Sequence, residues 1–205
     1  SCINAELSTD AAEIREIETW FNDIACGDIK RREFLKWISA YCLTYLEHDR
    51  KFYVLWGPTG QNGKGTMKEF IMSLSKGPDG FDSRAKNLLQ SFWSLRGNAN
   101  TAPENATPES YELMNKTFYY TDDISTVFLD AQKVKRIVGS EEGSGRGLYG
   151  KPVDVKPRGK VMWTTNFIPN GPGADNAYWE RFVVLKMMAK YLPADSGRVK
   201  PEEFR

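Results

Sequence analysis

The sequence is poor in the residues that zinc sites and disulfide frameworks require. It contains three cysteines and a single histidine, His48, in 205 residues. Cys2, Cys26 and Cys42 are widely separated, whereas the ligands of structural zinc usually come in closely spaced pairs. An odd number of scattered cysteines also gives no disulfide framework, so we expect unpaired thiols and a reducing compartment.

Long apolar runs, a leader sequence and a large net charge are missing as well. The longest apolar stretches, such as residues 52–56, fall far short of the ~20 residues of a membrane-spanning helix, so no membrane association is expected. The first residue is serine and no charged-then-apolar segment follows, which predicts an intracellular protein and a chain cut from a longer one. A formal net charge of +1 argues against a small, wholly basic nucleic-acid binder.

What is present suits one folded domain with a small appendage. Apolar residues make up 40% of the chain, enough to bury a core. Amphipathic periodicity predicts a helix over residues 8–26, capped by Asp10, and a second over residues 28–48. The second helix has an apolar stripe that we expect to be core, made of Phe34, Trp37, Ile38, Tyr41 and Tyr45. These helices form the expected N-terminal helical segment, residues 1–50.

Short β-prone runs alternate with predicted helices in the rest of the chain. The runs are residues 52–56, 118–121, 161–165 and 182–185. Helices are expected over residues 64–75 and 84–95 and from Pro108 onwards. This alternation predicts an α/β fold around a largely parallel sheet. We expect the α/β domain to cover residues 51–190, with residues 191–205 as a C-terminal tail.

The strongest local signal is a glycine-rich segment between the first run and a predicted helix. It consists of Gly57, Pro58, Thr59, Gly60, Gln61, Asn62, Gly63, Lys64, Gly65 and Thr66. In a phosphate-binding loop the backbone N–H groups surround the phosphates, and the lysine neutralises the γ-phosphate. Here the first glycine comes one residue early, and Gly65 stands where a serine or threonine usually binds Mg²⁺, which leaves Thr66 as the candidate hydroxyl. The context predicts ATP binding rather than a simple turn.

Two aspartates, Asp122 and Asp123, follow the second β-prone run. Paired carboxylates after a buried strand suit a site in which one holds Mg²⁺ and the other activates the attacking water. A solvated acidic turn is the alternative. Because the pair follows a phosphate-binding loop, we predict that Asp122 is a metal ligand and that Asp123 is a catalytic residue.

Two further polar residues are less specific signals. Asn166 ends the third run, where it can contact the γ-phosphate or simply cap a turn through its own backbone. Arg181 precedes the last run, where it can complete the site of a neighbouring subunit as an arginine finger or be a surface cation.

Four segments in this order resemble the motifs of superfamily 3 helicases, most closely the poxvirus-type primase–helicase lineage of large DNA viruses, phages and plasmids. The segments are residues 61–66, 120–123, 164–169 and 177–182. The resemblance implies an AAA+-like ATPase with Mg²⁺, in a hexameric ring that moves on a DNA strand or fork. It also implies a collar-like, oligomerising role for residues 1–50, and replication of a virus or mobile element in the host cytoplasm or nucleus. Glu180 stands where the lineage often has a second arginine, which leaves Arg181 as the finger candidate.

The stretch from residue 135 to 151 resembles motif B-prime of the same lineage, in which a β-hairpin contacts DNA. The resemblance implies DNA contacts for Arg146 and Lys151, and Lys156 continues the basic stretch. The charge distribution agrees, because residues 133–160 are mainly basic whereas residues 1–30 are mainly acidic. The net charge of +1 therefore arises because the acidic N-terminal stretch offsets the basic one.

Two other functions remain open at this point. An adenylate-kinase-like enzyme also has a Gly-Lys-Gly-Thr loop, but usually near the N-terminus and with an arginine-rich lid. Phosphate transfer to a nucleoside monophosphate without DNA would identify it. A non-catalytic module that binds nucleotide only to shape a ring would assemble without ATP turnover, and Asp123 counts against that reading.

Overall fold

A computed structural model describes residues 10–47, 49–76, 84–94, 108–124, 129–146, 150–168 and 175–191. Several positions discussed above, among them Cys2, His48, Pro169 and nearly all of the predicted tail, lie outside these residues. None of the helices in the described ranges has both the length and the apolar composition that crossing a bilayer demands.

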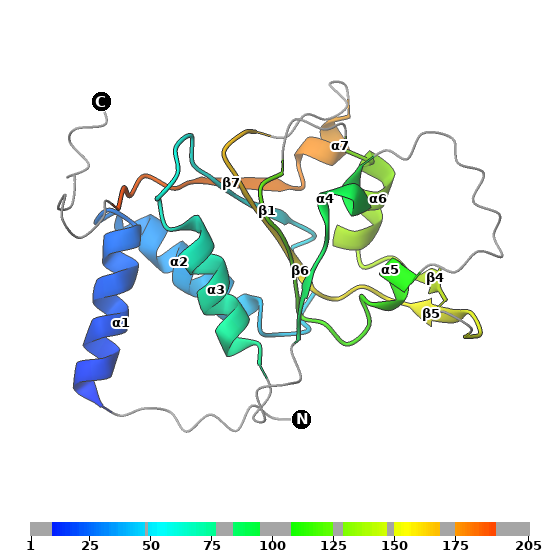
Figure 1. Ribbon diagram of the computed structural model, residues 1–205, viewed down its shortest axis with the longest axis horizontal. Coiled ribbons are helices and arrows are strands. Elements are labelled where there is room, and N and C mark those ends of the chain that lie inside the picture. The colour runs from blue at the N-terminus through cyan, green and yellow to red at the C-terminus, as the bar shows by residue number, and fades with distance from the viewer. Residues whose placement is uncertain are drawn as a thin grey trace.

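The described chain forms a mixed α/β fold around a five-stranded parallel sheet, as predicted (Figure 1). The strand order is β2-β3-β6-β1-β7. The strands are β1 (Phe52–Trp56), β2 (Ala85–Asn87), β3 (Phe118–Thr121), β6 (Lys160–Thr165) and β7 (Phe182–Lys186). Phe52 pairs with Val161 on one side and with Phe182 on the other, so β1 lies inside the sheet.

Helices cover both faces of this sheet (Figure 1). They are α1 (Ala11–Ile24), α2 (Ile29–Tyr41), α3 (Lys64–Leu74), α4 (Gln90–Trp93), α6 (Ala131–Val138) and α7 (Asn176–Trp179). A further short helix, α5 (Pro108–Tyr111), lies next to residues 143–145 and 153–155 instead. Alternate residues of β1 point to opposite faces. Tyr53 and Leu55 therefore pack with α1, α2 and α3, whereas Phe52 and Val54 pack with α4, α6 and α7.

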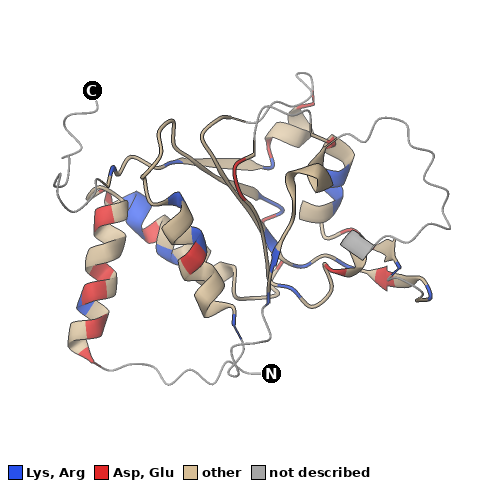
Figure 2. Cartoon of the chain, viewed as in Figure 1, with Lys and Arg blue, Asp and Glu red and all other residues tan. Residues whose placement is uncertain are grey.

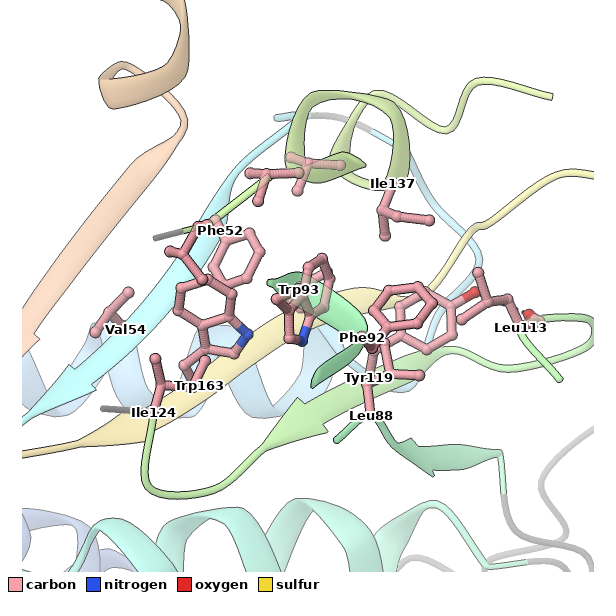
Figure 3. Packing of buried hydrophobic residues seen from close by; sticks show 14 of the residues in the cluster. Phe52, Val54, Leu88, Phe92, Trp93, Leu113, Tyr119, Ile124, Ile137 and Trp163 are labelled. Atoms are coloured by element: carbon pink, nitrogen blue, oxygen red, sulfur yellow. Dashed lines mark hydrogen bonds between the residues drawn. The ribbon is translucent and has the colours of Figure 1, made fainter. Parts of the chain in front are cut away.

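An aromatic cluster fills the second face. Figure 3 shows the rings of Phe52, Trp93 and Trp163 lying close together between the sheet and the covering helices. The Trp163 ring centroid is 3.8 Å from that of Phe52 and 5.4 Å from that of Trp93. Because all three side chains are fully buried, this cluster fixes α4 against the strands that lead into the candidate site.

The first predicted helix is confirmed, and the second is shorter than predicted. Asp10 caps α1 by accepting a hydrogen bond from the Ala12 N–H at 2.7 Å. α2 ends at Tyr41 instead of continuing to residue 48, because the Thr44 hydroxyl donates to the Tyr41 carbonyl as the chain turns towards β1. Tyr45 consequently lies beyond the helix and is exposed rather than part of its buried stripe. The prediction was also wrong for Trp37, which is 47% exposed on α2.

The prediction of one helix over residues 84–95 was wrong. Its first part is β2, which pairs in parallel with β3, and its second part is the single turn α4. The segment Ala85–Asn87 has little intrinsic preference for a strand. Hydrogen bonds with the exposed edge of β3, such as that from the Leu88 N–H to the Tyr120 carbonyl, determine its conformation instead.

The described elements include a separate two-stranded antiparallel hairpin of β4 (Gly143–Gly145) and β5 (Val153–Val155). It lies between α6 and β6 along the chain, so the predicted motif from residue 135 to 151 begins as a helix and continues into the hairpin. The acidic N-terminal part predicted above is also visible, because acidic residues follow one another along α1 (Figure 2).

Candidate nucleotide-binding site

The glycine-rich segment forms the loop between β1 and α3 at the carboxyl edge of the sheet. Gly63 has φ +80° at the helix N-cap, and a Cβ there would lie 2.9 Å from the side chain of Ile24. Gly57 has no room for a side chain, because a Cβ would lie 1.7 Å from the amide nitrogen of Asn62. Both glycines are therefore required by the loop itself.

Lys64 is the first residue of α3 and its ammonium group is turned back into the loop. Its Nζ donates to Oδ1 of Asn62 at 2.9 Å and to the Gly57 carbonyl at 3.2 Å. It also reaches across to β6, where Oδ1 of Asn166 accepts at 2.8 Å. Burial lowers the pKa of Lys64, and the charge of Asp123 partly offsets that effect. The loop thus holds a buried cation at a helix N-terminus, a favourable position for phosphate.

Asp122 and Asp123 follow β3, on the same edge of the sheet. Asp122 accepts a hydrogen bond at each carboxylate oxygen, from Lys68 Nζ to Oδ2 at 2.7 Å and from Thr164 Oγ1 to Oδ1 at 2.8 Å. Asp123 adopts a left-handed backbone conformation, with φ +49°. The chain therefore turns directly after the two carboxylates, and the next residue, Ile124, is buried in the core.

Asn166 is held at the end of β6 by its neighbours. Its backbone carbonyl accepts a hydrogen bond from Nε1 of Trp56 at 3.2 Å. The preceding residue, Thr165, donates through its hydroxyl to the Ile124 carbonyl at 2.7 Å. The ends of β1, β3 and β6 are therefore linked through side chains, and the Asn166 amide is fixed opposite Lys64.

The predicted residues of the loop and of two strand ends thus come together at one edge of the sheet. In the described ranges, no group of three acidic, histidine or cysteine side chains is arranged to hold a metal on its own. Mg²⁺ needs no such group, because it is commonly held by one or two carboxylates together with phosphates and water. Asp122, with Thr66 exposed in the first turn of α3, is compatible with that mode.

Arg181 lies away from this edge. It precedes β7 and therefore stands at the amino edge of the sheet, opposite the loop. A strand rise of about 3.3 Å per residue puts it roughly 20 Å from Gly57. Its guanidinium folds back towards α7 and donates to the Ala177 carbonyl. Arg181 is thus not part of the site that its own chain forms.

The three predicted DNA-contacting residues lie on or next to the hairpin. Arg146 donates through Nε to the Gly150 carbonyl at 2.8 Å, Lys151 is exposed, and Lys156 lies 3.3 Å from Glu47. The surrounding basic stretch does not form one surface. Lys160, for example, is buried and donates to the Thr44 carbonyl at 2.6 Å.

Sequence reasoning missed two side chains of the site, Lys68 and Thr164. Lys68 lies four residues after Lys64 and so on the same face of α3, which was a usable signal. Thr164 lies two residues before Asn166 and therefore points to the same side of β6. The link of both side chains to Asp122, however, becomes clear only once β3 is known to neighbour β6 and α3.

Comparisons with known proteins agree with this architecture. No family model matches the chain. A protein of Acanthamoeba polyphaga mimivirus, provisionally named helicase L207/L206, is 26% identical over 188 residues, which cover 91% of this chain and 18% of that protein. Apo structures of the NrS-1 C-terminal region (residues 305–718) superpose with a TM-score of 0.59 at 15% identity, over 98% of this chain and 44% of that one. A second apo form gives a TM-score of 0.56 at 15% identity. The chain therefore shares the fold of part of that region and has a viral relative, and it spans less than half of either.

Proposed function

We propose that this chain is the ATP-hydrolysing motor domain of a replicative DNA helicase from a virus or mobile element. One observation carries the proposal: Lys64, at the start of α3, lies 2.8 Å from Asn166 at the end of β6, beside the carboxylates that follow β3. This combination at the carboxyl edge of a parallel sheet suits binding and hydrolysis of a nucleoside triphosphate. The name of the mimivirus relative supports the helicase assignment.

Each residue of the site has a proposed role in hydrolysis. Lys64 and the backbone N–H groups of the loop, residues 57–66, bind the phosphates. Asp122 and Thr66 hold Mg²⁺, which when bound neutralises charge on the transferred phosphoryl group. Asp123 accepts the proton of the attacking water. Asn166 orients that water or the γ-phosphate, and it gives up its hydrogen bond to Lys64 when phosphate enters.

The position of Arg181 supports a ring of subunits. Since Arg181 stands at the sheet edge opposite its own loop, it cannot complete its own site without a large rearrangement. An arginine supplied in trans stabilises the negative charge of the transition state. We therefore propose a homo-oligomeric ring, with a hexamer as the working expectation, in which each Arg181 serves the neighbouring subunit.

Asp123→Asn is expected to separate nucleotide binding from hydrolysis. The substitution keeps the size of the side chain but removes the general base, so turnover should fall about 100-fold while nucleotide affinity stays within about twofold. ADP formation is measured with and without single-stranded DNA, and binding is measured separately. Stimulation of the wild-type chain by DNA supports a motor. DNA-independent phosphate transfer to a nucleoside monophosphate would instead identify the kinase alternative.

Lys151→Glu is expected to weaken DNA binding without changing ATP binding. Lys151 is exposed on the hairpin, far along the chain from the loop, so reversing its charge should lower affinity for single-stranded DNA several-fold. It should also reduce the salt dependence of binding by about one unit of slope. Fluorescence anisotropy with a labelled oligonucleotide at several salt concentrations measures both. Lys30→Glu, on α2, is the matched charge control. Equal effects of the two substitutions would contradict a specific role for the hairpin.

A further inference from the structure

Lys68 occupies a position that no part of the proposed mechanism uses. It lies on α3, one helical turn after Lys64, with Nζ 2.7 Å from Oδ2 of Asp122. Its side chain is only 13% exposed, and Nζ also lies 5.3 Å from the centre of the Tyr120 ring. Lys68 is therefore packed against β3 and directed at a carboxylate of the candidate site.

Asp122 has both carboxylate oxygens engaged. Oδ2 is paired with Lys68, and Oδ1 accepts the hydroxyl of Thr164 at 2.8 Å. A divalent cation that binds this carboxylate therefore lies close to the ammonium group of Lys68, whichever oxygen it takes. Two cations that share one carboxylate repel each other, and the repulsion is stronger at a partly buried site than in water.

We propose that Lys68 is a resident counter-ion of Asp122 that keeps a divalent cation away until nucleotide phosphate is present. The proposal rests on the proposed function, in which Asp122 holds the Mg²⁺ of a bound nucleotide. Without nucleotide, displacing Lys68 leaves its partly buried ammonium group without its carboxylate, which is costly. With nucleotide, phosphate oxygens are available to the displaced ammonium group. Lys68 thus makes the metal enter together with the nucleotide rather than ahead of it.

The test measures divalent-ion binding directly, without relying on activity. Mn²⁺ serves as the probe, because the electron paramagnetic resonance signal of the free ion falls as the ion binds. In the absence of nucleotide, Lys68→Met should bind Mn²⁺ at least about tenfold more tightly than the wild-type chain, since one repelling charge is removed. Lys68→Arg keeps the charge and should stay close to wild type.

Two controls identify the origin of any gain. Lys76→Met changes the net charge equally but alters an exposed residue after the end of α3, so it should leave Mn²⁺ binding unchanged. Adding Asp122→Asn to Lys68→Met should abolish the gain, because the carboxylate that binds the ion is removed. Lys68→Gln provides a second neutral variant if the methionine variant is unstable.

The outcomes separate this inference from the proposed function. If neither neutral variant binds Mn²⁺ more tightly than wild type without nucleotide, the counter-ion role of Lys68 is wrong. Adding ADP to the wild-type chain tests the function independently, because a nucleotide site should then lower the free-ion signal by more than protein alone and ADP alone account for. ADP itself binds Mn²⁺ in solution, so ADP without protein is the reference. No such additional loss of signal would contradict the nucleotide site, whereas the nucleotide-free comparison would still decide the role of Lys68.

Discussion

Lys64→Ala is expected to lower ATP affinity by at least about 100-fold and to abolish measurable ATP turnover. The side chain is the buried cation at the start of α3, where Asn62, Asn166 and loop carbonyls hold it in place. Its removal takes away the charge that neutralises the terminal phosphate, which weakens binding, and a preorganised donor of this kind typically also contributes about 100- to 1000-fold to the rate of the chemical step. Binding of a fluorescent ATP analogue gives the affinity, and ADP release gives the rate.

Lys76→Ala is the matched control for this experiment. It removes an equal charge from the exposed end of the same helical region, so affinity and turnover should stay at the wild-type level. Thermal unfolding of both variants checks that the fold is retained. A Lys64→Ala chain that binds ATP as well as wild type would place the nucleotide elsewhere and remove the basis of the proposed function.

Arg181→Ala is expected to lower ATP turnover about 1000-fold while nucleotide affinity stays nearly unchanged. An arginine finger acts on the charge that develops in the transition state, and its loss typically costs 10³–10⁵ in rate. Arg181 stands at the amino edge of the sheet, so its removal leaves the loop of its own chain intact. The same pair of measurements, analogue binding and ADP release, distinguishes this result from that of Lys64→Ala.

Arg15→Ala serves as the control for Arg181. Arg15 is an exposed arginine on α1, and its replacement should change neither rate nor affinity. If the Arg181→Ala chain turned over ATP at the wild-type rate, the assignment of Arg181 as an arginine finger would be wrong. A parallel loss of binding and turnover would indicate a structural role for Arg181 instead.

The sequence predicted the sheet, and the placement of the candidate residues at one edge of it, for a definite physical reason. Strands buried on both faces of a parallel sheet are short continuous apolar runs, so β1, β3 and β6 could be located within about one residue. β7 lies at the edge of the sheet and is only partly buried, but it is also a short apolar run and could be located in the same way. Polar residues that follow such runs collect at one edge, because parallel strands end on the same side. The sequence alone therefore groups Lys64, Asp122 and Asn166 at this edge.

The rest depended on contacts between distant parts of the chain. β2 forms because an open edge of β3 is available, and α2 ends early because the chain has to return to β1. The basic stretch looked continuous in sequence, yet Glu47 pairs with both Lys156 and Arg158. Local pattern cannot predict such pairs, because their members lie about a hundred residues apart.

The proposed division of labour between subunits suggests one decisive experiment. Lys64→Ala destroys a subunit's own site but keeps its Arg181, whereas Arg181→Ala keeps the site and lacks the finger. In a ring, mixing the two inactive chains creates interfaces in which an intact site meets an intact finger. Neither chain alone contains such an interface.

ATP turnover of this mixture, measured with single-stranded DNA present, tests the central claim most directly. An equal mixture that assembles at random should recover up to about a quarter of the wild-type rate, because half of the sites and half of the fingers are intact. Recovery should require the two chains to be in the same assembly and should grow with protein concentration. A mixture no more active than either variant alone would contradict a shared site between subunits.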